Sequence, residues 1–181
     1  RAVLGNEPGY VVILGTGSVG AYYDGQQIRA FTGGLGYLFG DEGSGAYLGK
    51  TLLLKWFKKQ LGQELSQRLE EYLGLNEQET IASIYQSARP NQKLAALTYW
   101  IKEHEGSLEI QKVIRENFNA FERDLLIPMI KNHEAQKVVF IGGVAHTFFK
   151  SIQEILKKHH LEGSVIQKPI DLLVQHHIKI S

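Results

Sequence analysis

The stretch from Val11 to Gly49 constrains the fold of this 181-residue chain most, because it concentrates glycines, hydroxyl residues and one adjacent acidic pair. It contains the motif GTGS at residues 15–18, followed by GGLGYLFGDEGSGAYLG at residues 33–49. A glycine inside a regular helix or strand costs about 0.5 to 1 kcal/mol relative to alanine. A core element gains nothing from this composition, so the stretch is typical of a loop that holds a ligand.

Composition and charge narrow the classes of partner. Twenty Lys and Arg side chains face nineteen Asp and Glu, and the net charge of +1 provides no general field for nucleic acid or an acidic membrane. The chain contains no cysteine, which excludes disulfides and thiolate metal sites and suits a reducing cytoplasm. No apolar run approaches the roughly 18 residues of a spanning helix. We therefore expect a cytoplasmic protein with no nucleic-acid or membrane partner.

The order of elements predicts a mixed α/β fold. Short apolar runs rich in β-branched residues predict antiparallel strands over residues 10–14, 19–23 and 27–31, with a type I′ turn at Asp24-Gly25. Helical spacing follows over residues 44–61, 63–73, 77–88, 92–103 and 108–132, where Pro128 introduces a kink or starts the final turn. The pattern ends with a strand over 137–141, a helix over 144–160, a strand over 164–167 and a helix over 170–177. We expect the block over about 63–132 to form a helical insert.

Two glycine motifs have the chemistry of phosphate or nucleotide binding. In the GTGS motif, glycine lets the backbone approach an anion, and the hydroxyls of Thr16 and Ser18 are neutral donors to phosphate oxygens. The Gly142-Gly143 pair follows a predicted strand and precedes a predicted helix, whose N-terminal amides attract negative charge. Either motif can also be a plain turn without a ligand, and a Gly-Gly pair at the end of a strand is more often that.

The adjacent carboxylates Asp41 and Glu42 allow two interpretations. They lie just before a predicted helix, where one of them could cap the helix N-terminus by accepting backbone N–H groups. Glycines flank the pair on both sides, however, and a carboxylate in a glycine-walled concavity is suited to accept hydrogen bonds from sugar hydroxyls. We favour the ligand-binding interpretation.

The histidines and a lysine cluster are predicted to lie on solvated surfaces. Neighbouring residues on a helix point about 100° apart, so the pairs His159-His160 and His176-His177 make no chelating face. His146 is expected on a helix surface. The lysines at positions 55, 58 and 59 are expected on the solvated side of an amphipathic helix rather than in an anion site.

Taken together, GTGS, the hairpin, GGLGYLFGDEGSGAYLG, the helical insert and VVFIGGVAHTFF resemble the C-terminal part of N-acetylglucosamine kinase and the related benzoyl-CoA reductase-activating (BadF/BadG/BcrA/BcrD) ATPase family. These proteins belong to the sugar kinase, actin and chaperone superfamily, in which two ribonuclease H-like domains close over ATP. The resemblance implies that residues 1–181 form the C-terminal, nucleotide-facing domain. It implies a missing N-terminal domain, with the catalytic base upstream of Arg1, so that this chain alone is inactive.

The resemblance also implies a role for each motif. It implies ATP-dependent phosphorylation of N-acetylglucosamine or a similar amino sugar, with Mg²⁺ arriving with ATP and held largely by the absent domain. Val19 and Leu35 stand where the N-acetylglucosamine kinases often carry Asn and Trp, which leaves the exact sugar open. The implied contacts are Thr16, Gly17 and Ser18 with ATP phosphates, Gly142, Gly143 and Val144 with adenosine, and Asp41 and Gly36 with the sugar.

Two other functions remain possible at this point. An ATPase activator of the benzoyl-CoA reductase type usually carries cluster-ligating cysteines, and this chain has none. A sugar sensor that kept the fold and lost catalysis fits the same motifs. In the family, the helical insert often contributes to a dimer surface, so a homodimer is a further expectation.

Overall fold

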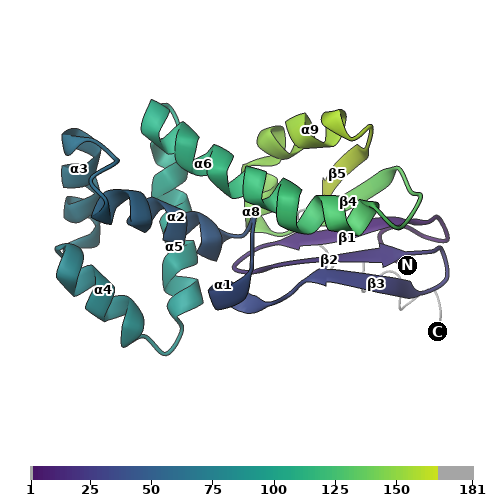
Figure 1. Cartoon of the computed structure of the whole chain (residues 1–181), viewed down its shortest axis with the longest axis horizontal. Coiled ribbons are helices and arrows are strands. Elements are labelled where there is room, and N and C mark those ends of the chain that lie inside the picture. The colour runs from purple at the N-terminus through teal and green to yellow at the C-terminus, as the bar shows by residue number, and fades with distance from the viewer. Residues whose placement is uncertain (1, 167–181) are drawn as a thin grey trace.

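The structure, a computed structural model, describes residues 2–166 and contains one five-stranded mixed sheet (Figure 1). The strands are β1 (Gly9–Leu14), β2 (Ser18–Tyr23), β3 (Ile28–Gly33), β4 (Lys137–Ile141) and β5 (Glu162–Ile166), in the order β3-β2-β1-β4-β5. The first three strands are antiparallel neighbours, whereas β4 pairs in parallel with both β1 and β5. The predicted α/β class and the antiparallel N-terminal strands are confirmed.

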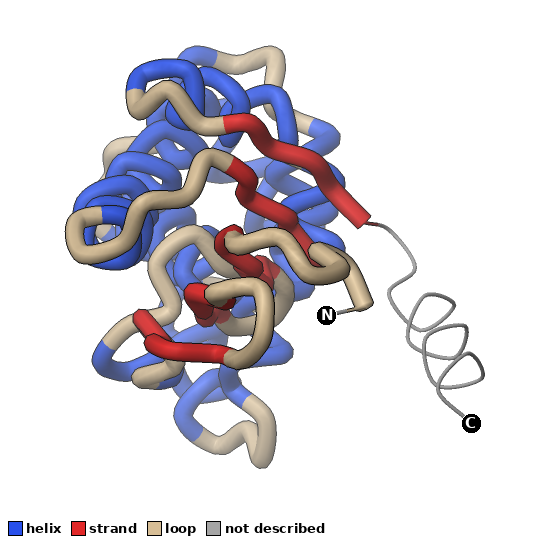
Figure 2. The backbone as a smooth tube through the Cα atoms, turned by 90° about the vertical axis from the view of Figure 1, so that its right-hand side faces the viewer, coloured by secondary structure: helices blue, strands red, loops and turns tan. Residues whose placement is uncertain are grey.

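Helices lie on one side of the sheet and form a further group beyond one end of it. They are α1 (Gly36–Phe39), α2 (Gly45–Phe57), α3 (Gln63–Leu73), α4 (Glu77–Tyr85), α5 (Pro90–Glu103), α6 (Leu108–Phe121), the π-helical η1 (Glu122–Leu126), α7 (Ile127–Ile130), α8 (Gly143–Thr147) and α9 (Phe149–Lys158). In Figure 1, α2 to α5 gather on the left, away from the strands, and α6 runs from that group back over the sheet. Figure 2 shows the strands fanning through the twist of the sheet, with helices behind them.

Local sequence chemistry sets the helix ends. Ser44 caps α2 by accepting the N–H of Tyr47, and Asn76 begins α4 with a capping box in which Glu79 bonds back to the Asn76 N–H. Gly74 ends α3 in the left-handed conformation that glycine adopts without strain. The predicted start of the first helix near Ser44 is confirmed for α2, and the capping side chain is the serine. Neither Asp41 nor its neighbour caps this helix.

One continuous core joins the sheet to the helices. Trp56 on α2, Trp100 on α5, Phe121 on α6 and Phe140 on β4 are all buried in the same cluster. The Phe121 and Phe140 rings meet edge to face with centroids 6.2 Å apart, which fixes the end of α6 over β4. The helices α2, α5 and α6 and the strand β4, which is distant from them in sequence, therefore share one hydrophobic core.

The predicted long helix over 108–132 is interrupted. A π-helical turn, η1, separates α6 from α7, and the Ile127 N–H donates to the carbonyl of Glu122, five residues earlier. Pro128 lies in the first turn of α7. A proline ring collides with the carbonyl four residues before it in a regular α-helix, and the wider π turn opens the backbone at this point. Pro128 therefore starts the final turn, as one of the two predicted outcomes had it.

Two glycines of the N-terminal strands make room for this interrupted helix. A Cβ added at Gly20 would lie 2.7 Å from the Met129 sulfur, and one added at Gly33 would lie 3.0 Å from Leu125 Cδ1. These glycines therefore serve packing, and the ligand interpretation of the stretch does not extend to them.

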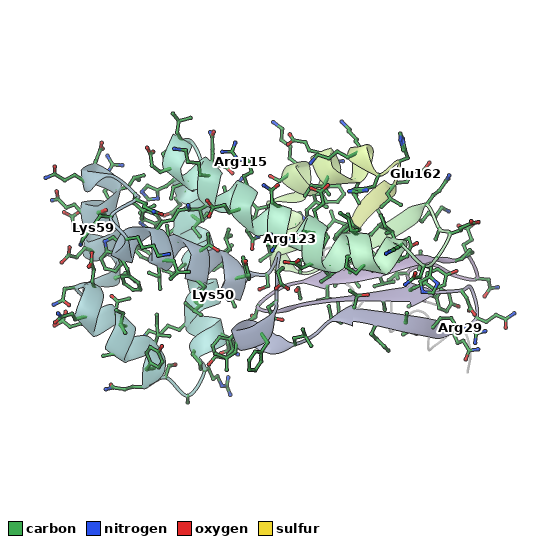
Figure 3. The ribbon with its side chains drawn as sticks, in the orientation of Figure 1. Arg29, Lys50, Lys59, Arg115, Arg123 and Glu162 are labelled. Atoms are coloured by element: carbon green, nitrogen blue, oxygen red, sulfur yellow. The ribbon has the colours of Figure 1, made fainter. Side chains whose placement is uncertain are left out.

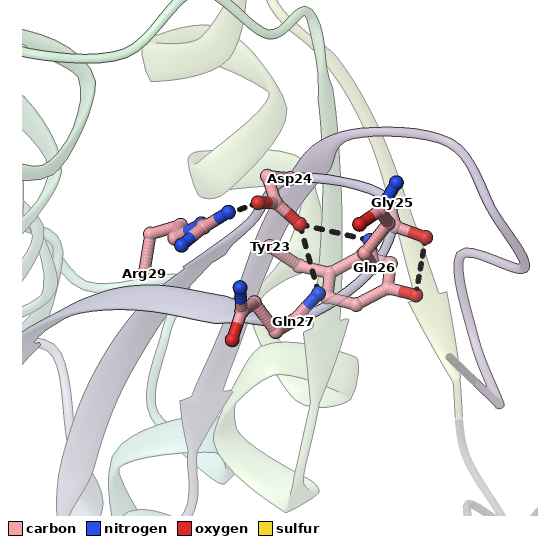
Figure 4. A network of polar contacts seen from close by, with 6 residues as sticks. All are labelled: Tyr23, Asp24, Gly25, Gln26, Gln27 and Arg29. Atoms are coloured by element: carbon pink, nitrogen blue, oxygen red, sulfur yellow. Dashed lines mark hydrogen bonds and ion pairs between the residues drawn. The ribbon is translucent and has the colours of Figure 1, made fainter.

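The predicted type I′ turn at Asp24-Gly25 is wrong. Four residues, 24–27, connect β2 to β3, and of the two predicted turn residues only Gly25 has a positive φ, at 97°. A type I′ turn requires positive φ at both central positions. Instead, Asp24 Oδ1 accepts the N–H groups of Gln26 and Gln27 at 2.8 Å each, and its other oxygen pairs with Arg29 (Figure 4). These bonds, led by the one from Gln27, lower the pKa of Asp24 to about 2.

Smaller differences concern element ends. The predicted helix over 77–88 ends at Tyr85, the helix over 144–160 divides into α8 and α9 at Phe148, and the final strand begins at Glu162. The predicted helix over 170–177 and the pair His176-His177 lie outside the described residues. No helix within residues 2–166 is long and apolar enough to cross a membrane.

Candidate functional site

The GTGS loop (residues 15–18) connects β1 to β2 and is fastened to the N-terminus of α2. The carbonyl of Gly15 accepts the Gly45 N–H at 2.8 Å, and the carbonyl of Thr16 accepts the Ala46 N–H at 3.1 Å. The first N–H groups of a helix have no partner within the helix. The loop therefore supplies acceptors that α2 needs, and both segments are held in place.

The second glycine motif lies directly beside this loop. Strands β1 and β4 are parallel neighbours, so their carboxyl ends, at Leu14 and Ile141, reach the same edge of the sheet. A Cβ added at Gly142 would lie 2.8 Å from the carbonyl carbon of Leu14, and Gly142 has φ 114°. Only glycine fits this position, which brings residues 142–144 against the start of the GTGS loop.

These two motifs and helix α5 enclose a cleft of about 570 Å³. Three of the predicted ATP-binding residues, Thr16, Gly143 and Val144, line this one cleft, although more than 120 positions separate Thr16 from the other two. The remaining lining residues are Gly15, Gln92, Ala95, Ala96, Thr98, Tyr99, Lys102 and Thr147. The described part of the cleft is therefore lined by glycines, apolar side chains, hydroxyl and amide side chains and one lysine, without a carboxylate.

Helix α5 supplies the wall that the sequence did not reveal. Its buried residues, Leu94, Leu97, Trp100 and Ile101, explain the helical pattern as core packing. The cleft residues lie between them on the other face, and α5 reaches the site only because it packs along α2. In the sequence, Thr98 and Tyr99 interrupt the apolar run between Leu94 and Ile101, and this interruption indicates no ligand by itself.

Two polar side chains of α5, Lys102 and Thr98, differ in their hydrogen bonding. Lys102 Nζ lies 2.7 Å from both carboxylate oxygens of Glu105 and 5.8 Å from the ring centroid of Phe148. The Thr98 hydroxyl is shielded from solvent and makes no hydrogen bond within the described part of the chain. This oxygen faces Gly45 of α2, where an added Cβ would lie 3.0 Å from it, so the hydroxyl belongs to the contact between α2 and α5.

The other predicted site residues do not line the cleft; they are Gly17, Ser18, Gly36, Asp41 and Gly142. Ser18 is buried, and its N–H donates to Asp41 Oδ1 at 3.1 Å. Asp41 is only 6% exposed and lies under Gly17, where an added Cβ would be 2.9 Å from Asp41 Oδ2. Gly17 and Ser18 are thus the part of the loop that rests on this carboxylate.

Gly36 begins the short helix α1 on the exposed side of the same region. Its φ of 77° favours glycine, and its carbonyl accepts the Gly40 N–H at 2.9 Å. Lys50 of α2 donates to the carbonyl of Tyr37 at 3.3 Å and ties α1 to α2 (Figure 3). The two predicted sugar-contacting residues therefore lie on one connected segment that leads into α2.

The predicted solvated surface is wrong for two of the basic residues. His159 Nε2 lies 2.8 Å from Glu122 Oε1, and Lys55 Nζ lies 2.6 Å from Glu116 with its side chain only 16% exposed. Both pairs join helices that are distant in sequence, which the sequence pattern could not show. His146 is exposed on α8, as predicted. Within residues 2–166, no group of three or more His, Asp or Glu side chains is placed to hold a metal ion.

No protein-family model and no curated protein matches the chain. Among solved structures, it is similar to a "putative N-acetylglucosamine kinase" from Porphyromonas gingivalis, with 32% identity, a TM-score of 0.88, and coverage of 99% of this chain and 63% of that protein. The chain shares that fold. It spans less than two thirds of the length of this protein and of the two that follow.

Two more distant structures show the fold alone. They are a "putative N-acetylglucosamine kinase" from Chromobacterium violaceum (22% identity, TM-score 0.69, 96% of this chain and 62% of that one) and a "putative N-acetylmannosamine kinase" from Listeria monocytogenes (12%, 0.51, 91% and 54%).

Proposed function

We propose that this chain is the nucleotide-facing part of an ATP-dependent kinase that phosphorylates N-acetylglucosamine or a similar amino sugar. The observation that carries the proposal is the meeting of the GTGS loop and residues 142–144 in one cleft of about 570 Å³. The name of the Porphyromonas gingivalis protein, 32% identical over nearly the whole chain, supports the sugar kinase class. The strand order, with three antiparallel strands followed by two parallel ones, supports a ribonuclease H-like domain.

In this proposal the nucleotide lies along the cleft. The phosphates meet Thr16 and Gly17, where a glycine-containing loop allows close approach of the backbone. The adenosine lies against Gly143 and Val144, opposite the cleft-facing side of α5. The interior of the cleft is large enough for a nucleotide-sized ligand.

The lining residues do not fit a magnesium site of their own. Mg²⁺ prefers oxygen ligands and is usually bound through one or two carboxylates together with phosphate oxygens. No Asp or Glu lines the described part of the cleft, and Asp41 is buried outside that lining. We propose that Mg²⁺ accompanies ATP and finds its protein ligands outside this chain.

The sugar and the catalytic base complete the proposal. Asp41 and Gly36 lie on the segment that precedes α2, and we propose that they contact the sugar hydroxyls. The base and the first phosphate motif belong, in this proposal, to an N-terminal domain outside this chain. Phosphoryl transfer depends on positioning and charge stabilisation, so the chain alone should turn over hardly at all.

A filled cleft tests the proposal directly. Ala96 is exposed on the cleft-facing side of α5, and Ala96→Phe places a large ring in the cleft. We expect it to weaken ATP binding by at least about tenfold in titration calorimetry of the full-length protein, because it occupies ligand volume. Ala82→Phe, at an exposed alanine of α4 that does not line the cleft, is the matched control and should leave affinity unchanged. A full-length protein that binds neither ATP nor any amino sugar would refute the proposal.

A further inference from the structure

One short segment holds the GTGS loop at three points. Residues 41–46, here called the clamp segment, accept the Ser18 N–H through the Asp41 carboxylate and donate the N–H groups of Gly45 and Ala46 to the loop carbonyls of residues 15 and 16. The three bonds are 2.8 to 3.1 Å long. The two backbone bonds survive any side-chain change, whereas the third depends on the side chain at position 41.

Asp41 is built into this contact. Its φ of 65° lies in the left-handed region, which most residues with a side chain avoid and which Asp and Asn enter more often than others. Its carbonyl accepts the Ser44 N–H at 3.0 Å, so the turn also leads into the cap of α2. The residue is thus fixed on both its backbone and its side chain.

Gly17 shows how closely the loop rests on this carboxylate. A Cβ at Gly17 would lie 2.9 Å from Asp41 Oδ2 and 3.1 Å from Oδ1. Real Cβ atoms are essentially never found at the shorter of these distances, so a side chain at position 17 would displace either the loop or the carboxylate. Asp41 Oδ1 takes the Ser18 N–H, and within the described residues Oδ2 makes no hydrogen bond.

We propose that Asp41 is a positioning residue for the phosphate-binding loop, and that it sets nucleotide affinity in addition to its proposed sugar contact. The inference rests on the proposed function. One carboxylate oxygen orders the loop that faces ATP, while the other remains for a hydroxyl donor from the sugar. The two ligands are therefore coupled through one side chain, and a change in its position alters both sites.

Three variants separate this role from a sugar contact alone. Asp41→Gly removes the acceptor while tolerating the positive φ, and Asp41→Asn keeps an oxygen for the Ser18 N–H. Glu42→Gln is the matched control at the adjacent, half-buried carboxylate. In ligand-free protein, we expect amide hydrogen exchange at Ser18 to accelerate by about tenfold or more in Asp41→Gly, because a charge-assisted hydrogen bond is lost. Asp41→Asn and Glu42→Gln should stay within about threefold of the wild type.

Nucleotide binding supplies the second measurement. In the full-length protein, Asp41→Gly should weaken Mg·ATP binding by about tenfold, and Asp41→Asn should restore it while sugar affinity remains reduced. Gly17→Ala, which presses a methyl group against the carboxylate, should weaken nucleotide binding as well. Combined with Asp41→Gly, it should cost less than the sum of the two single changes.

The outcomes are distinct. Unchanged Ser18 exchange and unchanged ATP affinity in Asp41→Gly, or strict additivity with Gly17→Ala, would overturn the positioning role. A loss of sugar affinity alone would assign Asp41 to the sugar and likewise overturn it. If the wild type binds no nucleotide while Ser18 exchange responds as expected, Asp41 still orders the loop and the proposed function is what fails.

Discussion

At the scale of single residues, the glycines of this protein serve different purposes, which depend on the atoms that lie against each of them. Gly17 and Gly142 allow close approach at the candidate site, to the Asp41 carboxylate and to the backbone of Leu14. Gly20, in contrast, makes room for Met129, which lies more than 100 positions later in the sequence. The composition of the stretch indicates that glycine is needed, but the reason at each position depends on a distant neighbour.

Gly142→Ala tests the close approach of the two loops. The added methyl group would press on the Leu14 carbonyl, and φ at this position is 114°. We expect a loss of about 2 to 4 kcal/mol in the free energy of unfolding by urea denaturation, from overpacking and backbone strain. Gly143→Ala is the control, because nothing lies within 4 Å of its added Cβ and its φ is not positive. Equal stability of the two variants would contradict the close approach.

At the scale of elements, the π turn η1 carries Glu122, whose contacts with Lys158 and His159 join the end of α6 to the end of α9. Burial raises the pKa of Glu122, but its hydrogen bonds to His159 and Lys158 outweigh burial and lower the pKa below its ordinary value of 4.5. A carboxyl whose pKa is lower in the folded state stabilises the fold above its unfolded pKa. That contribution disappears as the pH falls through the folded pKa.

Glu122→Gln should therefore reduce the loss in free energy of unfolding that occurs as the pH falls. We expect the variant to be less stable than the wild type near pH 7, with the difference shrinking as the pH falls below 4.5. Urea denaturation at a series of pH values measures this. Glu109→Gln, on α6 without a recorded ion pair in the described residues, serves as control. A constant difference at all pH values would contradict the linkage.

Most elements were predictable because their signals are local. The strand over 137–141, the start of a helix near Ser44 and the glycine that ends α3 depend on residues within a few positions of one another. The π turn and the loop at residues 24–27 were missed because each depends on a specific conflict or side-chain bond, at Pro128 and at Asp24. In the site, Thr16 and Val144 were predictable from their motifs. The wall formed by α5 was not, because only tertiary packing brings it there.

At the scale of the whole molecule, one region of the surface is unusually apolar. Ile28 and Phe31 on the edge strand β3, with Leu35, Leu38 and Phe39 in and beside α1, are all more than half exposed. We call these five residues the apolar edge. An exposed apolar edge strand favours pairing between molecules. The chain on its own is therefore expected to self-associate as its concentration rises.

The double variant Phe31→Lys/Phe39→Lys tests the apolar edge. Lysine on an edge strand opposes pairing, so the variant should stay monomeric at concentrations where the wild type grows in mass during sedimentation. Tyr85→Lys, at an aromatic residue of α4 that is 87% exposed, is the matched control. An equal effect of the control, or a wild type that stays monomeric throughout, would contradict the role of this surface.

The parallel pairing of β1 with β4 also determines at which stage of folding the cleft can form. Tyr10 on β1 pairs with Val138 on β4. The two glycine motifs therefore meet only after β4, which lies near the end of the described residues, has paired with β1. Contacts between residues so far apart in sequence form slowly, because the long intervening loop must first be closed. A ligand that binds only the completed cleft stabilises the finished fold and no earlier intermediate. During synthesis, ligand binding in the cleft would therefore indicate that the last strands have joined the sheet.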